Sequence, residues 1–98
     1  MIEIPLRNGV QNTHQRFSLR VGVNMLEFRV NYISYLDHPA WSLDVLRDGA
    51  TLIAGVMLEP NAEISKGYRA GIGRLFFIGQ EVTLDNLGVD NNLIWTEA

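Results

Sequence analysis

The sequence predicts an all-β fold: a single small β-sandwich or partly open β-barrel of about seven or eight short antiparallel strands. Apolar and polar residues alternate with a period of two in several segments, which is typical of half-buried strands. Turn-forming residues separate these segments every ~8–12 residues, as in sandwiches and barrels. No segment carries an apolar stripe at helical spacing, so the pattern favours strands throughout.

The first half of the chain predicts an edge strand followed by a hairpin. Residues 2–6 form the first strand, and Pro5 places it at a sheet edge because proline has no N–H to donate. Residues 16–21 and 24–32 alternate strictly, and the short connection at residues 22–24 contains glycine. We therefore expect these two segments to pair as a β-hairpin.

A second hairpin is expected in the middle of the chain. Residues 41–45 alternate, and residues 52–58 form an apolar run on the other side of the Asp48-Gly49 turn. Because that run is apolar on both faces, we expect a central strand or one covered by a neighbouring chain. Gly55 inside it predicts a bulge or a close backbone approach.

The last third of the chain predicts three short strands. Residues 59–68 read as a loop, a turn or a short edge strand, and residues 74–79 as a strand with aromatic side chains. We expect residues 80–84 to pair back on it, residues 85–88 to turn, and residues 93–95 to form the last strand. The exposed edges of residues 2–6 and 93–95 are then candidates for adding to a partner's sheet.

Composition limits the classes of function. The chain has 98 residues, so we expect one domain over residues 1–98. Only 19% of the residues are charged, and the formal net charge is −3. Its arginines and one lysine are dispersed, which argues against a nucleic-acid partner. The absence of cysteine excludes disulfides and thiolate metal sites. The start of the sequence does not resemble a signal peptide, and no apolar run reaches the roughly 20 residues of a membrane span.

The residues that could carry chemistry do not form a recognisable site. His14 and His38, with Asp37 or Asp44, lack the spacing of metal ligands. The sequence contains no Gly-x-Ser-x-Gly elbow and no histidine placed to activate a serine. Asp44 and Asp48 flank a hairpin turn rather than a cleft. We therefore expect no catalytic, metal or cofactor site, and a protein that is not an enzyme.

Apolar residues at the strand surfaces are the candidates for an interface. Phe76 and Phe77 are adjacent, so in a regular strand their side chains point to opposite faces. One of them belongs to the core, and the other must be covered by another element or by a partner. The full set of candidate interface residues is Ile2, Ile4, Tyr68, Phe76, Phe77 and Ile94.

A further group of residues stands in a distinctive order along the chain. It comprises Trp41, Leu43 and Asp44 in one strand, the Asp48-Gly49 turn, Gly55, the run Asp85-Asn86-Leu87-Gly88, and Trp95. In this order and spacing the chain resembles the small baseplate plug proteins of contractile-tailed bacteriophages, of cyanophages or other small myophages. The resemblance covers most of the chain and is firmest from Trp41 onward.

The resemblance implies a structural part of the virion, made in the host cytoplasm and built into the tail baseplate. It implies a plug at the tail axis that contacts the hub, spike and tail-tube proteins. An axial position implies a homo-oligomer of three- or six-fold symmetry. The alternative is a small β-sandwich module that binds a ligand or carbohydrate through an exposed Trp41 or Tyr68 ring.

Overall fold

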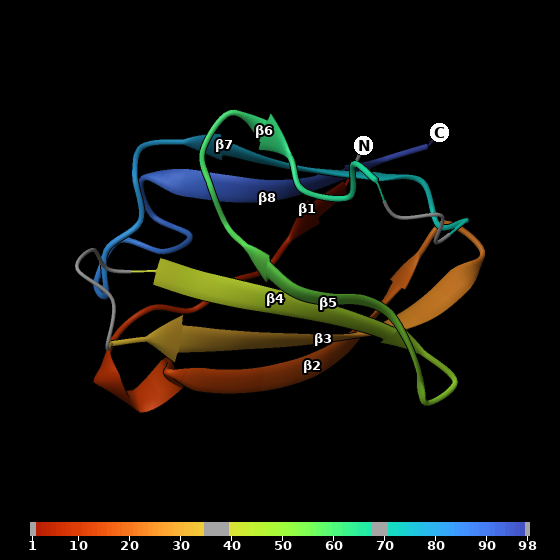
Figure 1. The fold of residues 1–98 in the computed structure, drawn as a ribbon, viewed down its shortest axis with the longest axis horizontal. Helices are drawn as coiled ribbons and strands as arrows, with labels where there is room; N and C mark the ends of the chain where they lie inside the picture. Colours follow the sequence, from red (N-terminus) through yellow and green to blue (C-terminus); the bar gives the residue numbers. More distant parts are fainter. Residues whose placement is uncertain (1, 35–39, 68–70, 98) are drawn as a thin grey trace.

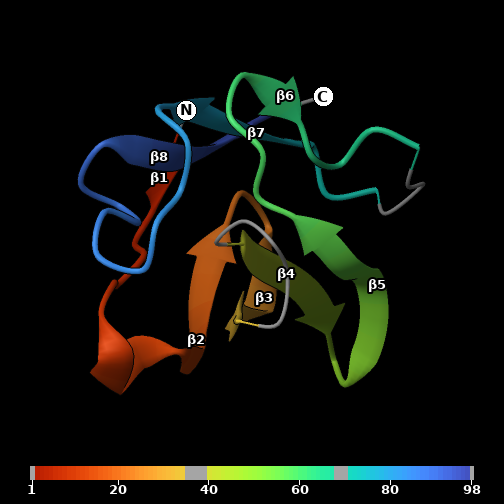
Figure 2. The same ribbon diagram turned by 60° about the vertical axis from the view of Figure 1, so that its left-hand side comes forward.

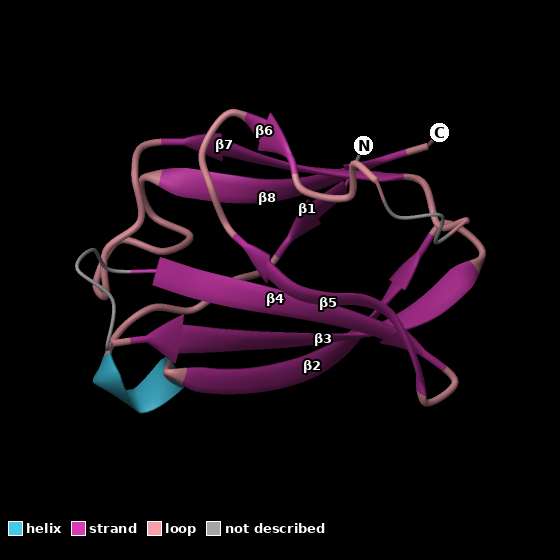
Figure 3. Ribbon diagram, viewed as in Figure 1, coloured by secondary structure: helices cyan, strands magenta, loops and turns pink. Residues whose placement is uncertain are grey.

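The computed structural model describes residues 2–34, 40–67 and 71–97, which form two antiparallel sheets packed as two layers (Figures 1 and 3). The elements are β1 (Ile2–Ile4), the 3₁₀ turn η1 (Val10–Asn12), β2 (His14–Val21), β3 (Asn24–Ile33), β4 (Ala40–Arg47), β5 (Ala50–Met57), β6 (Ala62–Glu63), β7 (Arg74–Gly79) and β8 (Asn91–Thr96). One sheet has the order β2-β3-β4-β5 and the other β1-β8-β7-β6. No strand pairing among the described residues joins the two sheets, so the fold is a sandwich and not a closed barrel.

The two predicted hairpins are confirmed and together make the first sheet. β2 and β3 pair in a continuous register around the turn at Gly22 and Val23, with Phe17 opposite Phe28. The two phenyl rings stack with their centroids 5.4 Å apart. β4 and β5 pair around the Asp48-Gly49 turn, where both residues have positive φ. Alternation of apolar residues therefore located these strands to within two residues.

The expectation of a central strand at residues 52–58 is wrong. β5 is the edge of its sheet, and its residues Ala54, Gly55 and Met57 are exposed. The register between β4 and β5 shifts beside Gly55, which has a φ of 65°. This confirms the predicted bulge. The register shifts a second time nearer the turn, and each shift adds one residue to β5. These extra residues move side chains out of strict alternation, which is why apolar residues on both faces of this run did not indicate burial on both faces.

The second sheet corrects two predictions about strand order. β8 lies between β1 and β7, so residues 93–95 do not form an exposed edge. Residues 80–84 are not a strand, and β7 pairs instead with β8. The prediction of a turn at residues 85–88 is confirmed, within a longer turn over residues 84–90. Figure 2 shows β1 beside β8 on one side of this sheet and β6 beyond β7 on the other.

Two asparagine side chains explain why residues 80–90 form a loop and not a strand. Asn86 accepts a hydrogen bond from the Thr83 N–H at 2.6 Å and donates to the Glu81 carbonyl at 2.8 Å. Asn91 is fully buried, accepts from the Gly88 N–H at 2.8 Å and donates to the Gln80 carbonyl. These bonds satisfy backbone groups that would otherwise pair in a sheet ladder.

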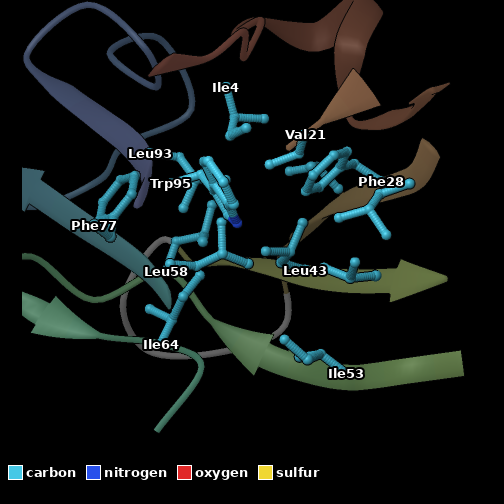
Figure 4. Close-up of a cluster of buried hydrophobic side chains, with 14 of the residues drawn as sticks. Ile4, Val21, Phe28, Leu43, Ile53, Leu58, Ile64, Phe77, Leu93 and Trp95 are labelled. Atoms are coloured by element: carbon cyan, nitrogen blue, oxygen red, sulfur yellow. The ribbon is translucent and has the colours of Figure 1, made fainter. Parts of the chain in front are cut away.

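The core lies between the two sheets and draws on nearly every strand (Figure 4). Its largest fully buried side chains include Trp41, Phe28 and Phe77. Trp41 donates its indole N–H to the Thr83 carbonyl at 3.0 Å, which ties β4 to the loop between β7 and β8. Trp95 donates to the Ile72 carbonyl, and its ring packs against Gly22 in the β2–β3 turn of the opposite layer. Both tryptophans therefore fasten one sheet to the other.

Phe77 and Phe76 are expected to differ in their contribution to stability. Phe77→Ala removes a fully buried ring and should lower the free energy of unfolding by about 3–5 kcal/mol. Phe76 points to the outer face, so Phe76→Ala should cost about 1 kcal/mol, the value of a lost cross-strand pair. Urea denaturation of the two variants measures the difference, and equal losses would contradict this assignment of faces.

Asn91 and its neighbour Asn92 form a second matched pair. Asn91→Ala should lower the free energy of unfolding by about 2–4 kcal/mol, because the Gly88 N–H and the Gln80 carbonyl lose their partner. Asn92 points outward and makes no side-chain hydrogen bond among the described residues, so Asn92→Ala should change stability by less than about 0.5 kcal/mol. Thermal unfolding of both variants tests this, and a stable Asn91→Ala protein would show that the loop does not depend on the buried amide.

Candidate functional site

The predicted interface residues divide into buried and outward-facing groups. Ile4 and Phe77 are fully buried, and Ile2 is half-buried against the core. Tyr68 lies outside the described residues. Phe76 and Ile94 point away from the core on neighbouring strands of the second sheet. Of the predicted set, Phe76 and Ile94 are therefore the two that the described structure brings together on an outer surface.

Phe76 and Ile94 are the centre of a row that crosses the whole second sheet. Ile94 pairs with Glu3 on one side and with Phe76 on the other, and Phe76 pairs with Glu63. The row thus has an apolar middle and a carboxylate at each end. We define the β7–β8 outer face by the outward residues of this sheet, which are Glu3, Glu63, Arg74, Phe76, Ile78, Asn92, Ile94 and Thr96.

The carboxylate of Glu63 is held in place by a buried serine. Ser65 is 5% exposed; its hydroxyl donates to Glu63 Oε2 at 3.0 Å and accepts from the Leu75 N–H at 3.0 Å. One hydroxyl therefore fixes Glu63 relative to β7. No motif in the sequence indicated this role, because a lone serine in a turn is normally solvated.

The first sheet presents a different outer surface. We define the β2–β3 outer face by the outward residues of those strands, which are His14, Arg16, Ser18, Arg20, Met25, Glu27, Arg29 and Asn31. Arg16 lies directly opposite Arg29 in the register, and Arg29 Nε is 2.6 Å from Glu27 Oε2. A shallow open hollow of about 500 Å³ is lined by His14, Gln15, Arg16, Arg29 and Asn31. This clustering of arginines depends on the strand register, so their scattered positions in the sequence did not reveal it.

The two outer faces lie on opposite sides of the molecule, with the core between them (Figure 1). The β7–β8 outer face combines apolar side chains with two carboxylates and Arg74, and the β2–β3 outer face combines three guanidinium groups with polar side chains and Glu27. Surfaces of this kind can bind other proteins through apolar burial and charge pairing.

The group of residues that carried the family resemblance supports the fold. Trp41, Leu43, Leu87 and Trp95 are buried, and the Asp44 carboxylate accepts the Gly55 N–H at 2.6 Å, across the bulge. Leu87 and Gly88 lie against the start of the chain: Asn8 donates to the Leu87 carbonyl at 3.0 Å. A side chain at Gly88 would collide with the Leu6 carbonyl. Asp48 and Gly49 make the β4–β5 turn, and Asp85 is exposed at the start of its loop.

The residues considered for chemistry have structural contacts. His14 Nδ1 lies 2.9 Å from Asn31 Oδ1, across the strand pair, while His38 and Asp37 lie outside the described residues. In the part of the chain that the structure describes, no three histidine, aspartate or glutamate side chains gather as metal ligands would. No helix among the described residues is long and apolar enough to cross a membrane.

The binding-module alternative required an exposed aromatic ring. Trp41 is fully buried, and its indole N–H is already bonded to the Thr83 carbonyl. Tyr68, the other ring considered, lies outside the described residues. Nothing in the described structure therefore favours this alternative over an assembly surface.

Comparison with known proteins identifies the family. A family model described as cyanophage baseplate Pam3 plug gp18 matches residues 1–98. No match to this chain was found among curated proteins. A baseplate plug is a structural part of the phage tail, so membership implies a place in the virion tail and contact with other baseplate components. The chain belongs to the family of cyanophage baseplate plug proteins.

Proposed function

We propose that this chain is a non-enzymatic structural component of a contractile myophage tail, a plug at the tail axis that contacts the hub, spike and tube end. The observation that carries this proposal is the family match over residues 1–98. In this proposal residues 1–98 act as one plug-like β-domain, made in the host cytoplasm and assembled into the virion. Neither a cofactor nor contact with nucleic acid or membrane is required for this role.

The structure supports the proposal through its rigidity. Two sheets are fastened by buried tryptophans, and within the described residues every buried side-chain nitrogen or oxygen has a hydrogen-bond partner. Such a domain keeps its shape when it is pressed against neighbours, because local opening requires breaking packed and bonded contacts. A plug that closes or joins parts of a tail needs this property.

The β7–β8 outer face supports the proposal through its chemistry. Ile78 is 43% exposed and lies on the same face as Phe76 and Ile94. Apolar side chains on the outer face of a small sheet gain stability when a neighbouring subunit covers them. We propose that this face is covered in the assembled baseplate, and that several copies are arranged around the tail axis with three- or six-fold symmetry.

The location is tested on purified virions. Tails are separated from capsids, baseplates are isolated, and each fraction is analysed by quantitative mass spectrometry. We expect this chain in the baseplate fraction, in a fixed ratio to the hub protein. Its absence from every virion fraction would overturn the proposed function.

The role of the β7–β8 outer face is tested by placing a charge in its apolar middle. Phage that lack their own plug gene are grown in a host that expresses the Phe76→Asp protein. The number of plug copies per virion should fall at least about tenfold, because an aromatic residue at the centre of an interface typically contributes about 2 kcal/mol or more to binding. The matched control is Val23→Asp, since Val23 is 90% exposed at the tip of the β2–β3 turn. Copies of plug per virion are counted by mass spectrometry. Equal incorporation of both folded variants would exclude Phe76 from the assembly contact.

A further inference from the structure

Charge is distributed unevenly between the two sheets. Residues 7–34, which include β2 and β3, carry four arginines and one glutamate, a formal charge of +3. Residues 58–98, which include β6, β7 and β8, carry six acidic and three basic residues, a formal charge of −3. These strands lie in opposite layers of the sandwich (Figure 1). The net charge of −3 therefore conceals one basic and one acidic side.

The basic side has two arginines that form no ion pair with any residue the structure describes. Arg16 faces Arg29 across the strand pair, and like charges placed directly opposite each other destabilise a sheet. Glu27 is paired with Arg29. Arg16 and Arg20 are both exposed and form no ion pair with another described residue. These two guanidinium groups are available to a carboxylate from outside the molecule, and Arg16 borders the hollow described above.

The acidic side presents carboxylates at a matching separation. Glu3 and Glu63 are three strand spacings apart, which is about 14 Å at ~4.8 Å per spacing. Arg16 and Arg20 are four residues apart along β2, which is about 13 Å at ~3.3 Å per residue. Ser18 stands between the arginines on the same face, and Ile94 and Phe76 stand between the glutamates. If the strands of the two faces cross near a right angle, Ser18 of one copy lies opposite Ile94 and Phe76 of the other.

We propose that the β2–β3 outer face of one copy binds the β7–β8 outer face of a second copy, with Arg16 and Arg20 pairing with Glu3 and Glu63. This inference rests on the homo-oligomer of the proposed function and adds the two surfaces that form it. Met25, which is 53% exposed beside Arg20, adds apolar area to the contact. Because the two faces differ, each copy uses both of them and the contact is head-to-tail. Successive copies then form a closed ring or an open series, depending on the rotation between them.

The experiment measures self-association of the purified full chain by sedimentation velocity over a dilution series. We expect species larger than the monomer, and a weaker association as salt rises from about 0.1 M to about 1 M, where the screening length falls from roughly 10 Å to roughly 3 Å. Arg16→Glu/Arg20→Glu and Glu3→Arg/Glu63→Gln should each raise the dissociation constant at least about tenfold. Lys66→Glu is the control for net charge, since Lys66 is exposed in the turn after β6, and it should associate like the unmodified chain.

Mixing the two double variants gives the decisive measurement. Arg16→Glu/Arg20→Glu has two acidic faces, and Glu3→Arg/Glu63→Gln has two basic faces, so neither variant should associate with itself. Each acidic face of the first variant can bind a basic face of the second. Equimolar mixing should restore association, with the two variants alternating. Thermal unfolding confirms that each variant is folded, and Arg16→Glu alone replaces the first variant if that is unfolded.

Three results would overturn the inference: a chain that is monomeric at every concentration, double variants that self-associate like the unmodified chain, or a mixture that stays dissociated. None of these results removes the protein from the baseplate, which the virion measurement tests separately. A monomer that is found in purified baseplates would assign both faces to other baseplate proteins.

Discussion

The two tryptophan side chains that cross between the sheets are the constraint on which the rest of the structure depends. A buried indole N–H must find an acceptor, and Trp41 finds the Thr83 carbonyl in the loop that joins β7 to β8. Trp95 finds the Ile72 carbonyl, just before β7, while its ring packs against Gly22. Each bond therefore fixes a long connection as well as a side chain. The loop over residues 80–90 then holds its shape through Asn86 and Asn91, and Leu87 anchors it in the core.

Residues that stabilise the fold are therefore distinct from those on the outer faces that can bind a partner. The residues by which the family can be recognised in the sequence are largely those that set turns, a bulge and the core, such as Asp44 beside Gly55 and Gly88 against Leu6. Phe76 and Arg16 belong to no such motif, because their side chains point outward, where packing restricts the residue type less than it does in the core. We therefore expect the fold to be shared across the family through the first group, and partner choice to be decided by the second.

The sequence predicted local structure well and long-range pairing poorly, for a physical reason. Both hairpins of the first sheet followed from alternation and turn residues, since strand, turn and partner are adjacent in the chain. The pairing of β8 with β1 joins residues 89 to 93 positions apart, and nothing local encodes it. Residues 80–84 carry a strand-like pattern, but asparagine side chains take up the backbone groups that a ladder would use. The opposition of Arg16 and Arg29 required the register itself.

The properties of the edge strands indicate that assembly uses the outer faces of the sheets rather than their edges. An edge strand invites pairing with another chain unless it is short, bulged or charged. β1 has three residues and is followed by Pro5, β6 has two residues, and β5 is bulged at Gly55. β2 is an eight-residue edge with a continuous register, and its outward residues include Arg16 and Arg20. Addition of residues 2–6 to a partner's sheet is accordingly limited to a very short ladder. The outer faces offer a larger and more specific contact than the edges. One has an apolar middle between carboxylates, and the other carries arginines. The charges of β2 therefore protect an edge and also select the face that a neighbour binds.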